Sequence, residues 1–131
     1  MNKRIAVVSL LCGLALAGVA FGQAAVTRTV LQRSDLPESV SEGVQGVAEF
    51  PPGTALGRHT HAGVEMGYVL SGDLVISING KEPLKLKAGD SYTIPAGVVH
   101  DAANNSSGVS KVLATWIVEK GKPLATPAPA P

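Results

Sequence analysis

The chain has 131 residues, the length of one compact domain of ordinary size. Hydrophobic residues make up 45% of it and charged residues 16%, which is enough apolar material for a core and too much for a disordered chain. The net charge of +1 argues against a nucleic-acid binder that needs a basic face, and the one cysteine, Cys12, excludes an internal disulfide.

Residues 1–24 have the three-part pattern of a secretory signal peptide. Lys3 and Arg4 supply the positive start, an apolar run covers residues 5–20, and small residues follow it. The alternative is an uncleaved membrane anchor, but the run is short for a spanning helix and no basic cluster follows. We therefore expect a periplasmic or secreted protein that has lost Cys12, with no membrane attachment after cleavage.

Residues 25–120 read as one domain built from short strands, without a long amphipathic helix. The runs are rich in Val, Ile, Leu and Thr and are separated by Gly and Pro. The expected strands cover residues 27–33, 44–50, 64–70, 74–78, 83–87, 92–95, 98–101 and 109–118. Asn79-Gly80 predicts a two-residue hairpin turn with two positive φ angles. This spacing predicts an all-β sandwich or barrel.

Alternation predicts which strand faces are buried. The expected inward residues are Leu74, Ile76, Ile78, Leu84, Leu86, Val112, Ala114, Trp116 and Val118. Residues 121–131 have no apolar periodicity, and their prolines among alanines predict an extended, mobile tail. A role for this tail as the ligand of a proline-recognition module is disfavoured outside the cytoplasm.

All three histidines lie in two glycine-bounded segments, residues 53–72 and 89–104. His59 and His61 are two apart, so on a strand both rings project from the same face. Glu65 follows a flexible Ala-Gly pair, and His100 follows a tight turn that lets it approach from another strand. Three imidazoles and one carboxylate suit one divalent transition ion, namely Mn, Fe, Ni, Cu or Zn.

Ordinary polar roles are the alternative for each of these residues. A His-x-His pair is a weak signal, and Glu65 alone reads as a solvated strand charge. Glu65 is, however, surrounded by apolar residues, where an unpaired carboxylate is costly and a metal would remove the cost. Without further information, the residues favour a metal site and ordinary polar roles about equally.

The two segments resemble the paired motifs of the cupin family. They match the pattern G-x5-H-x-H-x3-E-x6-G and then G-x5-P-x-G-x2-H-x3-N at every specified position. Ala62 is a departure, since many cupins carry proline there. The resemblance implies an antiparallel jelly-roll barrel and one metal ion held by His59, His61, Glu65 and His100. It implies a structural role for Asn104.

The ligand set resembles that of quercetin-type dioxygenases and oxalate-processing enzymes. The leading hypothesis is therefore a metal-dependent, dioxygenase-like oxidoreductase that acts on a small oxygen-chelating molecule, with Glu65 as the catalytic proton shuttle. The alternative is a non-catalytic metal-containing module that binds or senses a small molecule. Tyr68, Tyr92 and Trp116 are pocket walls or plain core residues.

Charge and strand exposure indicate which macromolecular partners to expect. After signal cleavage nine basic residues face ten acidic ones, so we expect no nucleic-acid partner. Small barrels with exposed edges often pair, and residues 27–33 offer a candidate edge for a homodimer. Asp90 is expected to cap a turn, while Arg58 and Asp101 alternate away from the histidines.

Overall fold

The computed structural model describes residues 24–131. The predicted signal peptide at residues 1–24 lies outside the described residues except for Ala24. In the part of the chain that is described, no helix has the length and apolar character needed to cross a membrane. The regular elements of this part are strands, which confirms the all-β prediction.

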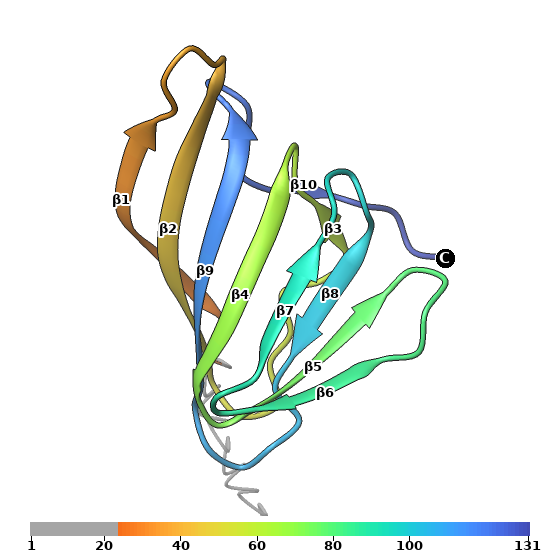
Figure 1. The fold of residues 1–131 in the computed structure, drawn as a ribbon. Coiled ribbons are helices and arrows are strands. Elements are labelled where there is room, and N and C mark those ends of the chain that lie inside the picture. The colour runs from red at the N-terminus through yellow and green to blue at the C-terminus, as the bar shows by residue number, and fades with distance from the viewer. Residues whose placement is uncertain (1–23) are drawn as a thin grey trace, which may run out of the picture.

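Two antiparallel five-stranded sheets face each other and form a barrel that fits the predicted jelly roll (Figure 1). The first sheet has the order β1 (Thr27–Asp35), β2 (Ser41–Phe50), β9 (Ser110–Glu119), β4 (Val64–Ser71) and β7 (Ser91–Ile94). The second has the order β10 (Thr126–Pro127), β3 (His59–Thr60), β8 (His100–Ala103), β5 (Asp73–Ile78) and β6 (Leu84–Lys87). Consecutive strands β4 and β5 lie in different sheets, so the Gly72 turn between them is a corner of the barrel.

The core lies between the two sheets and is built from the predicted alternating faces. The inward residues Leu74, Ile76 and Ile78 of β5 and Val112, Ala114, Trp116 and Val118 of β9 are all buried. Burial of one large apolar side chain stabilises a fold by about 1.5–3 kcal/mol, so these two strands contribute a large part of the driving force. They also form the apolar walls of the interior.

The hairpin between β5 and β6 differs from the prediction in two ways. The Lys81 amide donates to the Ile78 carbonyl at 3.0 Å. Of the two turn residues, Gly80 has a positive φ and Asn79 does not. The turn is therefore not the type with two positive φ angles that Asn79-Gly80 predicts. Five residues then separate the strands. Leu84 is 39% exposed rather than inward, because β6 is the edge of its sheet and little lies over it.

The C-terminal tail pairs with β3, a contact that its Pro/Ala composition did not predict. Thr126 lies opposite Thr60, and Pro127 lies opposite His59. The Ala128 amide donates to the Arg58 carbonyl at 2.9 Å. This pairing uses backbone groups and not side chains, so apolar periodicity carries no signal for it. The short strands β3 and β10 were both missed for this reason.

Asn104 links the chain after β2 to the loop before β9, as expected of a structural residue. Its side-chain amide donates to the carbonyls of Phe50 at 2.9 Å and Gly108 at 2.7 Å, and its oxygen accepts from the Ser106 amide at 2.9 Å. The side chain is fully buried. Asp90 likewise accepts from the Lys87 amide at 2.9 Å, which confirms its role in a turn.

We predict that Asn104→Ala lowers the free energy of unfolding by about 2–3 kcal/mol, because buried backbone groups lose their partners. Urea denaturation of purified protein measures this change. The matched control is Asn105→Ala, since Asn105 is exposed and should be nearly neutral. Equal midpoints for the two variants would show that the Asn104 bonds contribute nothing.

Candidate metal centre

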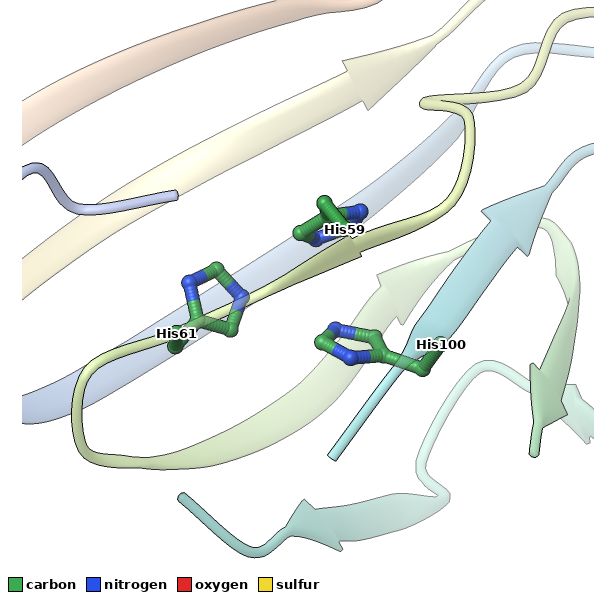
Figure 2. Close-up of side chains that lie close together, drawn as sticks. All are labelled: His59, His61 and His100. Carbon is green, nitrogen blue, oxygen red and sulfur yellow. The ribbon is translucent and has the colours of Figure 1, made fainter. Parts of the chain in front are cut away.

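The three histidines meet inside the barrel, as predicted from their spacing. His59 begins β3, His61 follows that strand, and His100 begins β8, directly opposite His59 in the antiparallel register. All three rings are buried, with centroids 4.3–5.1 Å apart, and they point toward one another (Figure 2). One nitrogen from each ring lies within 4.8 Å of the others, so the three histidines are positioned to bind a metal ion.

Backbone carbonyls fix the same tautomer in all three histidine rings. Each histidine has its Nδ1 atom at a carbonyl oxygen: Gly57 for His59 at 2.7 Å, Val98 for His100 at 2.9 Å, and Leu124 for His61. A carbonyl only accepts hydrogen bonds, so each Nδ1 must carry the proton. In a neutral ring the lone pair is then on Nε2, the atom that faces the common centre.

The Nε2 atom of His59 is a buried acceptor without a donor. It is buried and has no hydrogen-bond partner among residues 24–131. Burial lowers the pKa of His59, and the nearby His100 and His61 lower it further, against the opposing effect of the Gly57 carbonyl. A neutral imidazole with a buried, unused lone pair fits a metal ligand.

Glu65 reaches the same centre from β4. Its Oε2 atom lies 2.6 Å from Nε2 of His61 and 3.5 Å from Nε2 of His100. Since the Nδ1 proton of His61 is already donated to a carbonyl, Nε2 and the carboxylate would otherwise be two acceptors in contact. A proton or a cation must therefore lie between them.

Two glycines allow the chain to bring Glu65 back beside the histidines. A Cβ on Gly63 would lie 1.7 Å from the Ile117 carbonyl oxygen, so only glycine fits where the turn after His61 crosses β9. A Cβ on Gly67 would lie 2.1 Å from the ring of Tyr92, its partner on β7. The space at Gly67 is what allows that ring to lie across β4.

Tyr92 uses this position to hold the carboxylate. Its hydroxyl donates to Oε1 of Glu65 at 2.7 Å, which leaves Oε2 for the histidines. Burial opposes ionisation of Glu65, but its close contacts with His100, His61 and Tyr92 outweigh burial and lower the pKa of Glu65 well below its usual range. Burial, together with the Glu65 charge, raises the pKa of Tyr92, so the hydroxyl stays protonated.

A small interior cavity of about 10 Å³ adjoins these groups. It is lined by Arg28, Ala48, Phe50, Leu56, His59, Glu65, Ile76, Tyr92, His100, Ala102, Val112, Ala114 and Trp116. Of the three aromatic candidates, Tyr92 and Trp116 line it, and the indole of Trp116 donates to Nε2 of His61 at 3.3 Å. Tyr68 is 47% exposed and is neither wall nor core. Arg58 and Asp101 are absent from the lining, as alternation predicted.

Sequence reasoning missed Arg28 altogether. Its guanidinium lies 5.5 Å from the centre of the Trp116 ring and lines the cavity, although most of β1 is exposed. Burial lowers the pKa of Arg28, while the Glu65 charge raises it. An arginine among threonines and valines on an edge strand has the pattern of a solvent-facing residue, so no local signal marks it.

Comparison with known proteins gives the class to which this fold and site belong. Residues 46–118 match the cupin domain family, and the chain is therefore a member of the cupin family. A curated relative, the HTH-type transcriptional regulator PuuR of Escherichia coli, is 42% identical over 65 residues, 49% of this chain. The match spans 35% of that regulator, about a third of its length.

Solved structures agree with this assignment. A conserved protein with a double-stranded β-helix domain from Klebsiella pneumoniae superposes with a TM-score of 0.68 at 20% identity, over 83% of this chain and 89% of that one. A predicted oxalate decarboxylase from Thermotoga maritima has a TM-score of 0.53 at 28% identity, over 60% and 80% of the two chains. The cupin resemblance stated from the motifs is thus confirmed.

The contact between His61 and the Leu124 carbonyl predicts that the tail supports metal binding. Deletion of residues 124–131 should weaken the affinity for a divalent ion by about tenfold or more, because the His61 ring loses the partner that sets its orientation. Competition with a fluorescent chelator measures this affinity. The control is deletion of residues 130–131, which keeps every tail contact described here. Equal affinities for both truncations would rule out a positioning role for Leu124.

Proposed function

We propose that this cupin is a metal-dependent, dioxygenase-like oxidoreductase that acts on a small oxygen-chelating organic molecule. His59, His61, His100 and Glu65 would hold one divalent ion of Mn, Fe, Ni, Cu or Zn. The observation that carries the proposal is the set of three Nε2 atoms, each of which has the ring's lone pair because Nδ1 donates to a carbonyl, and all of which face one centre beside a carboxylate. Such an ion would polarise the oxygens of a substrate and bring dioxygen alongside.

The protein side of this chemistry depends on Glu65. While Oε2 lies against His61 and His100, the lowered pKa makes Glu65 a weak base. Once Oε2 leaves these partners it becomes able to take a proton from a substrate hydroxyl, while the Tyr92 hydroxyl still anchors Oε1. Tyr92 itself remains protonated and so acts as the anchor of the base. The apolar residues around the cavity would exclude bulk water from the exchange.

A second candidate function is a metal-containing module that binds or senses a small molecule without turnover. The likeness of half of this chain to part of a protein named as a transcriptional regulator favours it. The compact barrel also offers few acid–base groups beyond Glu65 at the cavity. Export and the expected homodimer stay predictions, although residues 27–33 do lie on β1, an edge strand as expected.

The metal assignment predicts a definite order among variants. His59→Ala and His100→Ala should lose most of the bound ion, and Glu65→Gln should lower affinity by about 10- to 100-fold, because a neutral amide is a poorer ligand of nearly the same shape. Elemental analysis after dialysis against each candidate metal measures the content. Asn104→Ala is the control and should keep its metal while losing stability. Equal metal content in all four variants would contradict the assignment of His59, His100 and Glu65 as metal ligands.

Measurement of oxygen uptake distinguishes the proposed oxidoreductase from the non-catalytic binding module. We expect the protein loaded with iron, manganese or nickel to consume dioxygen with at least one member of a panel of flavonols, enediols and small hydroxy acids. Glu65→Gln, tested at full metal occupancy, should reduce the rate by about 10²-fold or more if Glu65 is the proton acceptor. Silence with every metal and substrate, together with measurable binding of a panel member, would favour the module instead.

A further inference from the structure

The histidine centre is closed to any molecule larger than water. The interior cavity beside it has a volume of about 10 Å³, which is the space of one water molecule. Within residues 24–131 the three histidines and Glu65 are buried, with only 2–6% of their surface exposed. A small molecule can therefore reach the Nε2 atoms only after part of the barrel has moved.

The C-terminal tail is held far less firmly than the strands of the first sheet. In that sheet β2 and β9 pair along ten residues, and β4 pairs with both β9 and β7. The tail strand β10 pairs with β3 over two residues, and both residues of β10 are exposed. Its prolines have no amide proton, so the tail cannot form a long ladder of hydrogen bonds. Local opening at the tail therefore costs less than separation of the sheet.

The tail also lies at the place where opening would expose the histidines. A recess of about 180 Å³ on the outer side of the cavity is lined by Arg28, Leu56, Arg58, His59, Ala125 and Pro127. Three of these residues, Arg28, Leu56 and His59, line the interior cavity as well, so the recess adjoins it. After β9 the tail crosses from the first sheet to the edge of the second, where it forms one wall of the recess (Figure 1).

The closed position of the tail has an apolar anchor and a flexible joint. The Leu124 side chain is half-buried and packs against the core, while its carbonyl accepts from Nδ1 of His61. Gly121 lies between β9 and this anchor with a φ of 76°, in the left-handed region that glycine enters without strain. Movement about Gly121 would lift Leu124 and the residues after it as one segment.

We infer that residues 121–131 form a strap that closes the cavity and must leave β3 before a molecule larger than water reaches the three histidines. The strap controls access, so the inference goes beyond the proposed function and applies equally to an enzyme and to a binding module. Release of the strap also removes the Leu124 carbonyl from His61. Opening therefore exposes the centre, and closure orients the His61 ring.

The test measures how fast diethyl pyrocarbonate, a reagent much larger than water, acylates the histidines of the metal-free protein. The chain has three histidines and all lie in the centre, so the labelling reports on this centre alone. Mass spectrometry of digested protein gives the rate for each ring. Deletion of residues 124–131 should raise these rates about tenfold or more, because the closed state is lost. Deletion of residues 130–131 is the control and should label like wild type.

A disulfide that locks the strap gives the opposite change. Thr60 and Thr126 are opposite each other in the antiparallel register, a spacing that suits a disulfide between Thr60→Cys and Thr126→Cys. With Cys12→Ser also introduced, the disulfide form should be labelled about tenfold or more slowly than wild type. Reduction should restore the wild-type rate. Equal rates for the disulfide form and wild type would overturn the inference, because the histidines would then be reached by another route.

Asn104→Ala distinguishes opening of the strap from unfolding of the whole domain. Its side-chain bonds involve residues outside the tail, so its labelling rate should stay within about twofold of wild type. A rate as high as that of the 124–131 deletion would contradict the strap. Should that deletion fail to fold, the disulfide comparison decides by itself. Because the labelling uses no metal, a protein that binds no ion would overturn the proposed function and leave this test intact.

Discussion

The hydrogen bonds between three histidine Nδ1 atoms and three backbone carbonyls are the constraint on which the site depends. They come from three separate parts of the chain, at Gly57, Val98 and Leu124. A backbone carbonyl cannot donate, so each bond sets both the orientation of its ring and the atom that carries the proton. The metal-binding character of the centre is thus built into the backbone, and the side chains need no further adjustment to present Nε2.

The carboxylate side of the centre depends on close packing in the same way. Gly63 and Gly67 leave room where any side chain would meet the Ile117 carbonyl or the Tyr92 ring. Those spaces let β4 pass close to β9 and β7, and they place Glu65 between the histidines and Tyr92. Removing the space at Gly67 would displace the tyrosine that anchors Glu65. The acid is therefore supported by packing around two residues that contribute no chemistry of their own.

Much of this arrangement could be predicted because it is encoded locally. The alternation of Leu74, Ile76 and Ile78 marks a buried face, and the spacing of His59, His61, Glu65 and His100 marks a possible ligand set. The contributions that were missed come from residues without a side-chain signal. The Leu124 carbonyl lies in a tail whose composition suggests no packing, and Arg28 lies on an exposed edge strand. Both act through tertiary contacts, which local periodicity does not report.

The central claim is that the backbone holds all three histidines with the proton on Nδ1 and the lone pair on Nε2. Long-range ¹H–¹⁵N correlation spectra of the metal-free protein, labelled with ¹⁵N-histidine, report this directly at a pH where the rings are neutral. We predict a protonated Nδ1 in His59, His61 and His100. Spectra in which these rings carry the proton on Nε2 instead would contradict it, because the lone pairs would then point away from the common centre.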